Sequence, residues 1–141
     1  MRSICFAVVA LLTACASKPE AATAGEKDPC SDFELDVERV WSAGIKAEIL
    51  GHGGELQASE RKAVVTKLDQ LSDDWVRLRT ATCRDHFHRK LIDADTYRQR
   101  VKCFDDRLDE QRKIVAIAKG NDTAGAAKLA DGMAGSTNAC K

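Results

Sequence analysis

The sequence contains 141 residues, with 22 basic and 22 acidic side chains and a pI near 6.8. This length suits one compact domain, and the balanced charge argues against nucleic-acid binding, which requires clustered Lys and Arg and a pI above about 9. A hydrophobic content of 44%, with only 9 Gly and 2 Pro, indicates a folded protein rather than a disordered one.

The first residues have the pattern of an export signal. Arg2 precedes an apolar run from Ile4 to Leu12, which is much shorter than the roughly 20 apolar residues of a membrane-spanning helix. Residues 1–14 are therefore predicted to be a signal peptide. The order Leu12-Thr13-Ala14-Cys15 resembles a bacterial lipobox, which implies that Cys15 becomes the lipid-bearing first residue. The alternative is an A-x-A site for ordinary secretion at Ala14-Cys15-Ala16.

Residues 15–29 are predicted to be the lipidated cysteine and a flexible tether. The segment is rich in Ala, Lys, Glu, Pro and Gly and has no apolar period. As a flexible coil it would have a root-mean-square reach of roughly 20 Å. We expect a lipoprotein on the periplasmic side of the cell envelope. Ala16, rather than Asp, after the cysteine resembles the outer-membrane sorting pattern of some bacteria, which implies the outer rather than the inner membrane.

Residues 30–140 are predicted to form one all-α domain, because their apolar residues recur with the helical period and none alternates as in a strand. We expect a small antiparallel bundle of three main helices and a short C-terminal helix, with two disulfides. The first helix is expected to begin near Ser31 or Asp32 and to end at the glycine-rich residues 51–54. Its buried side is predicted to comprise Val37, Val40, Trp41, Ile45 and Ile49.

The next two helices, from about Ser59 and about Asp95, are predicted to form an antiparallel hairpin. Their apolar stripes follow a heptad spacing and mirror each other about Asp93, which predicts a turn near residues 92–95. The 4-residue spacing of Cys83, Phe87 and Leu91 predicts that the buried side rotates toward Cys83 near the turn. The two stripes are Leu68, Leu71, Trp75, Leu78 and Thr82 on one helix, and Val101, Phe104, Leu108, Gln111, Val115 and Ala118 on the other.

The C-terminal part is predicted to be the least packed. A short fourth helix is expected to begin at Asp122 or Thr123. Its one large apolar residue is Leu129, so we expect this helix to add little to the core. Residues 132–139 are predicted to be a loose segment that ends at Cys140.

Cysteines in an exported chain favour disulfides. With Cys5 in the signal and Cys15 lipidated, four remain, and we predict the pairs Cys83–Cys103 and Cys30–Cys140. Cys83 and Cys103 also mirror about Asp93, but an ideal coil places them on opposite flanks, so this bond depends on the predicted rotation. A disulfide requires Cα atoms within about 7 Å of each other.

A metal site is the alternative use of these cysteines. Cys83-x-x-His86, with His88 close by, supplies only one half of the usual four-ligand zinc set. We therefore expect no metal and no cofactor, and we interpret both histidines as exposed residues near a turn.

No catalytic constellation is recognisable in the sequence. The pairs Asp73-Asp74 and Asp105-Asp106 are adjacent, so their carboxylates diverge on a helix. Trp41 and Trp75 lie in apolar stripes and are expected in the core. Motifs for a nucleophile elbow, a phosphate-binding loop or a zinc protease are missing. We expect no enzymatic activity, and no small-molecule substrate is identified.

Several Cys, Trp, Arg and Leu residues punctuate the chain between residues 29 and 140. They are Pro29-Cys30, Val40-Trp41, Leu68-Asp69, Trp75, Thr82-Cys83, Arg100-x-x-Cys103, Arg107-Leu108 and Cys140. Their order resembles the extracytoplasmic segment of the large transmembrane Ser/Thr protein kinases of myxobacteria, which also contain tetratricopeptide repeats. Phe104 stands where that family usually has Leu, and the kinase motifs and the repeats are absent, so kinase activity is not implied. The resemblance implies a disulfide-braced helical module for sensing or protein interaction.

Two functions follow as hypotheses. The first is a non-catalytic, lipid-anchored module that senses or binds a protein partner in the envelope. The second is a small envelope chaperone or scavenger, and a purely structural envelope component is a further alternative. The chaperone would use a basic and apolar side of the two long helices that includes Arg77, Arg79, Arg84, Arg89, Arg98 and Arg100.

Overall fold

A computed structural model describes residues 27–52, 58–120 and 122–141. The predicted signal peptide, Cys15 and most of the predicted tether lie outside these ranges. Within them every regular element is a helix, which confirms the all-α fold class, and none of these helices has the length and apolar character to cross a membrane. The elements are α1 (Phe33–Glu38), α2 (Ala43–Gly51), α3 (Ala58–Phe87), α4 (Ala94–Lys119), α5 (Thr123–Met133) and the 3₁₀ helix η2 (Ser136–Cys140).

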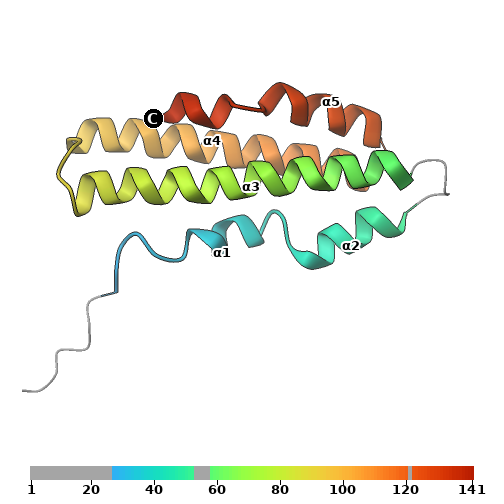
Figure 1. The fold of residues 1–141 in the computed structure, drawn as a ribbon, viewed down its shortest axis with the longest axis horizontal. Coiled ribbons are helices and arrows are strands. Elements are labelled where there is room, and N and C mark those ends of the chain that lie inside the picture. Colours follow the sequence, from blue (N-terminus) through green and yellow to red (C-terminus); the bar gives the residue numbers. More distant parts are fainter. Residues whose placement is uncertain (1–26, 53–57, 121) are drawn as a thin grey trace, which may run out of the picture.

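The two long helices α3 and α4 form the predicted antiparallel hairpin at the centre of the molecule (Figure 1). Helices α1 and α2 lie along one side of it, and α5 and η2 lie along the other (Figure 1). Val101, the first residue of the predicted α4 stripe, is only partly buried. The other ten residues of the two predicted stripes are buried, which confirms the stripes as the core of the hairpin. These residues are Leu68, Leu71, Trp75, Leu78, Thr82, Phe104, Leu108, Gln111, Val115 and Ala118.

The hairpin turn comes earlier than predicted. Helix α3 ends at Phe87, and α4 begins at Ala94 because the Asp93 carboxylate accepts the backbone N–H of Thr96 at 2.7 Å. The buried side does not rotate toward the turn as predicted, since Phe87 is 40% exposed and Leu91 is 69% exposed. The turn therefore presents apolar side chains on its surface.

The single first helix of the prediction is two helices. Ser42 adopts an extended backbone, and its hydroxyl accepts the backbone N–H of Ile45 at 3.3 Å, so it begins α2 as an N-cap. Asp32 is the residue before α1, but its side chain makes no capping hydrogen bond. The predicted burial of this segment is nevertheless confirmed for Val37, Val40, Trp41 and Ile49, with Ile45 partly buried against the core.

The disulfides join Cys30 to Cys83 and Cys103 to Cys140, with Cα atoms 5.5 and 5.6 Å apart. All four predicted cysteines are therefore bonded, but the predicted pairing of Cys83 with Cys103 and of Cys30 with Cys140 is wrong. The two helix cysteines face opposite flanks of the hairpin. The segment before α1 covers the flank of Cys83, and η2 covers that of Cys103, so each cysteine bonds the segment beside it.

The C-terminal helix packs more closely than predicted. The Asp122 carboxylate accepts the backbone N–H of Gly125 at 2.8 Å, which confirms the predicted start of α5. Its core contacts come from Ala126, Ala130 and Met133, whereas Leu129 is 48% exposed. The expectation that α5 adds little to the core is wrong because small side chains let it approach both α3 and α4.

The Asp93 cap predicts an acid-dependent step in stability. Hydrogen bonds from Thr96 hold the pKa of Asp93 below its ordinary value of 3.8. The stabilisation by this cap is complete above pH 3.8 and is lost as the pH falls through the lower pKa of the folded state. The reason is that the hydrogen bonds to the carboxylate exist only in the folded state. We expect Asp93→Asn, which still caps, to weaken this decline in thermal midpoint between pH 5 and pH 2, and Asp93→Ala to lower the midpoint already at pH 7. An unchanged acid decline in Asp93→Asn would contradict the assignment.

Candidate functional site

The residues of the alternative metal site have other partners. Cys83 is in a disulfide, and His86 stacks on Tyr97 with its Nδ1 3.1 Å from the carbonyl oxygen of Ile92. His88 Nε2 lies 3.0 Å from Asp28 Oδ1, near Cys30. Because Cys30 is also disulfide-bonded, it offers no thiolate to a metal. The backbone N–H of Cys30, followed by His88, lowers the pKa of Asp28.

The two adjacent aspartate pairs diverge as predicted. Asp74 pairs with Arg77 at 2.7 Å, and Asp106 pairs with Lys102 at 2.8 Å. Asp73 instead faces a groove under α1, and burial raises the pKa of Asp105. Neither pair brings its two carboxylates to one shared position.

The arginines of the predicted basic side are largely neutralised. Arg77 on α3 and Arg98 on α4 each pair with a carboxylate three residues earlier on the same helix, and Arg89 in the turn pairs with Asp85 of α3. Arg79 is 8% exposed, with its guanidinium carbon 4.4 Å from the ring centre of Phe33 and its Nη1 donating to the Tyr97 hydroxyl at 3.2 Å. Four of the six predicted arginines thus have acidic or aromatic partners, while Arg84 is exposed and Arg100 is partly exposed.

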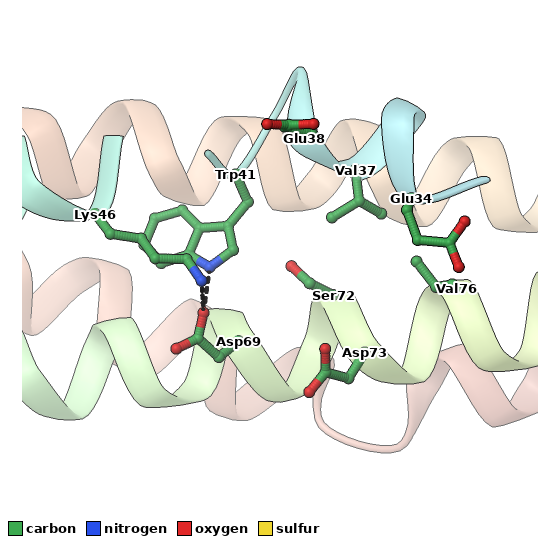
Figure 2. A pocket seen from close by; sticks show the side chains of 9 residues that line it. All are labelled: Glu34, Val37, Glu38, Trp41, Lys46, Asp69, Ser72, Asp73 and Val76. Atoms are coloured by element: carbon green, nitrogen blue, oxygen red, sulfur yellow. Dashed lines mark hydrogen bonds and ion pairs between the residues drawn. The ribbon is translucent and has the colours of Figure 1, made fainter. Parts of the chain in front are cut away.

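A small acidic groove lies between α1, the start of α2 and α3 (Figure 2). At its centre Trp41 Nε1 donates to Asp69 Oδ1 at 2.7 Å, and Lys46 Nζ lies 2.5 Å from the same oxygen. Trp41 is 4% exposed, which confirms its predicted place in the core. The groove of about 280 Å³ is thus occupied at its centre by side chains that satisfy one another. Its other carboxylates are Glu34, Glu38 and Asp73.

A larger apolar groove of about 690 Å³ runs between α4 and α5. Its floor contains Ile114 and Met133, which are both buried, and the half-exposed Leu129 stands on its α5 side. Gly132 also lines the groove, and a Cβ atom there would meet nothing within 4 Å. Two helices therefore enclose an open apolar channel that no other described segment fills. We take this α4–α5 groove as the candidate interaction site.

The rim of the α4–α5 groove is basic. Arg107, Lys113 and Lys128 line it together with one carboxylate, Glu110. Arg107 Nη1 contacts Glu110 at 2.6 Å, but the Nε of Arg107 is buried and has no hydrogen-bond partner. A buried donor without a partner is unfavourable. The positive charges of Lys113 and Lys128 would attract an acidic group that enters the groove.

The α4–α5 groove is not among the features predicted from the sequence. The spacing of Arg107 and Lys113 in the sequence matches no motif and does not indicate that they lie beside α5. The available signal was the composition of the fourth helix, in which small residues alternate with single large ones at Leu129 and Met133. In α5 the small residues and Met133 are buried against the hairpin, whereas Leu129 stays half-exposed at the edge of the contact.

The chain matches no protein-family model, no curated protein and no solved structure. The resemblance to the myxobacterial kinase segments therefore remains a hypothesis based on the scattered residues that carry it.

Proposed function

We propose that the chain is a non-catalytic lipoprotein, anchored through Cys15 on the periplasmic side of the outer membrane, that binds an envelope protein through the α4–α5 groove. The observation that carries the interaction role is that groove, with its apolar floor and basic rim. The two disulfides support an oxidising compartment outside the cytoplasm.

The geometry of the groove favours one kind of occupant. Helix α5 has 11 residues, which corresponds to a length of about 16 Å. This length accommodates about three turns of a partner helix, and the floor suits its apolar side. Three cations against one carboxylate at the rim favour acidic residues beside that apolar stripe. The proposed partner segment is therefore an acidic amphipathic helix.

Photo-crosslinking in living cells tests this proposal. A photoreactive residue at Leu129 is expected to give a discrete protein adduct, and the same residue at Leu50, which is 43% exposed on α2, is expected to give none. Lys113→Glu with Lys128→Glu should reduce the adduct about tenfold or more, because like charges at a docking rim cost roughly 1–2 kcal/mol. The matched control is Lys62→Glu, an exposed lysine on α3.

The same cells test the anchor. Cys15→Ala is expected to abolish incorporation of radiolabelled fatty acid and to move the chain from the membrane fraction to the soluble fraction. Equal crosslinking from Leu129 and Leu50, or an adduct insensitive to the charge reversal, would contradict the groove. Unchanged fatty-acid labelling of Cys15→Ala would contradict the anchor.

A further inference from the structure

The chain enters the domain at the end of the bundle that carries the α3–α4 turn. Cys30 is bonded to Cys83 near the end of α3, and Asp28 contacts His88 in the turn at 3.0 Å. The first described residues accordingly lie beside the turn, at the end of the bundle away from α2 (Figure 1). The residues before Lys27, including Cys15, are therefore joined to the domain at this end.

The turn exposes apolar side chains at that same end. Leu91 is 69% exposed, the largest value among the large hydrophobic residues of the described chain, and Phe87 is 40% exposed. Phe87 packs edge-to-face on Tyr97, with ring centres 5.4 Å apart, and Tyr97 stacks on His86 at 4.5 Å. These ring contacts with Tyr97 and His86 fix the position of Phe87 at the surface. We call Phe87, Leu91 and the neighbouring Lys90 the turn surface.

Charged groups of both signs surround the turn surface. Residues 84–98 contain four cationic and three acidic side chains, and Asp28 beside His88 adds a fourth carboxylate at this end. Arg89 pairs with Asp85 at 3.0 Å, Arg98 pairs with Asp95, and Asp93 is the α4 cap. Arg84 and Lys90 are exposed, and Lys90 adopts a left-handed backbone (φ 55°) that glycine adopts at lower cost. Lys90 thus places an ammonium group next to Leu91 in the turn.

Exposed apolar residues with basic neighbours are the composition of surfaces that insert into lipid headgroups. The 12 residues from Cys15 to Glu26 span at most about 40 Å in any conformation. Helix α3, with 30 residues, is about 45 Å long. A lipid on Cys15 would therefore keep the turn end within about 40 Å of the bilayer, and the opposite end of the bundle could lie up to a helix length farther away.

We propose that the turn surface contacts the headgroup region of the membrane in which Cys15 is anchored. This inference rests on the proposed lipid anchor, but not on the α4–α5 groove. Leu91 and Phe87 enter the interface, and Arg84 and Lys90 face the lipid phosphates. The occupant is a phospholipid bilayer that contains an anionic lipid. The contact orients the bundle with its turn end on the membrane.

Fluorescence quenching of the full-length lipoprotein tests the orientation. The protein with Leu91→Trp is reconstituted in vesicles of phosphatidylethanolamine and phosphatidylglycerol whose acyl chains are brominated near the headgroup. Trp41 and Trp75 are buried, so we expect about one third of the total emission to be lost, from one of three indoles. The matched variant Leu129→Trp, at a residue that is 48% exposed on α5, should lose almost none.

The outcomes separate this inference from the proposed function. A mass spectrum that includes the acyl chains on Cys15, together with no quenching of Leu91→Trp, would overturn the turn contact and leave the anchor intact. Equal quenching of Leu91→Trp and Leu129→Trp would overturn the proposed orientation, because both residues would then approach the lipid to the same extent. A mass without acyl chains would overturn both the anchor and the membrane contact. Quenching confined to Leu91→Trp supports the proposal.

Discussion

Trp75→Ala is expected to lower the free energy of unfolding by about 3–5 kcal/mol, the range for removing a large aromatic side chain from a core. Trp75 is 2% exposed at the centre of the α3–α4 hairpin. Its ring meets Phe33 and Phe104 edge-to-face, with ring centres 6.4 and 6.3 Å away. Its Nε1 also donates to the carbonyl oxygen of Phe104 at 2.7 Å, so the side chain joins α1, α3 and α4.

Urea denaturation followed by far-ultraviolet circular dichroism measures this loss without relying on tryptophan emission. Trp75→Phe keeps a ring but removes the N–H, so a smaller loss of about 1–2 kcal/mol is expected. The matched surface change Leu129→Ala should stay within about 0.5 kcal/mol of the unmodified chain. A loss for Trp75→Ala no larger than that of Leu129→Ala would contradict the central role of this contact.

The hairpin was predictable because heptad spacing reports directly which side of each helix is buried. The spacing predicts burial correctly even at a position occupied by a polar residue. Gln111 is polar, yet it is 1% exposed, as its position in the stripe predicts. Its Nε2 donates to Ser72 Oγ at 2.6 Å, and the Ser72 hydroxyl donates to the carbonyl oxygen of Leu68 at 2.8 Å. Position therefore determined burial, and a local hydrogen-bond chain made that burial tolerable.

The features that escaped prediction depend on lateral packing between segments. Which segment covers each flank of the hairpin determines the cysteine pairing, and periodicity along one helix contains no such information. The break between α1 and α2 depends on a single serine cap at Ser42. Leu91 is exposed because α3 ends at Phe87 and a six-residue turn follows. The 4-residue spacing of Cys83, Phe87 and Leu91 therefore does not continue as one side of a helix.

The α4–α5 groove escaped prediction for the same reason. Its floor and rim come from two helices, and α5 packs on the bundle through the buried Ala126 and Ala130. Small residues give weak signals in a hydrophobic pattern, although they allow the closest helix approach. The groove therefore becomes visible only when both helices are placed, whereas the proposed lipobox at Cys15 is a prediction from a few consecutive residues.

Loss of either disulfide is expected to lower the free energy of unfolding by about 2–4 kcal/mol. The bonds close separations of 53 and 37 residues, for which a chain-entropy model gives about 4 kcal/mol each, with measured values usually smaller. The variants are Cys30→Ala with Cys83→Ala, and Cys103→Ala with Cys140→Ala. Both partners must be replaced, because a remaining thiol would attack the other bond.

The two variants should differ in which segment of the chain becomes more mobile, and this difference distinguishes the roles of the two bonds. Without Cys30–Cys83 we expect faster amide exchange in residues 27–42, and without Cys103–Cys140 in residues 134–141, each segment being held at one end by its own bond. Exchange that accelerates equally in both segments of either variant would contradict this local role.

Peptide mapping of the unmodified chain establishes the pairing on which both variants depend. Cleavage after Lys and Arg places the four cysteines on separate peptides, residues 28–39, 80–84, 103–107 and 129–141. Without reduction we expect 28–39 joined to 80–84 and 103–107 joined to 129–141. A crosslink between 80–84 and 103–107 would mean that the two helix cysteines share a flank. The N-terminal segment would then have no covalent bond to the turn end, so the same map also tests the geometry behind the proposed membrane contact.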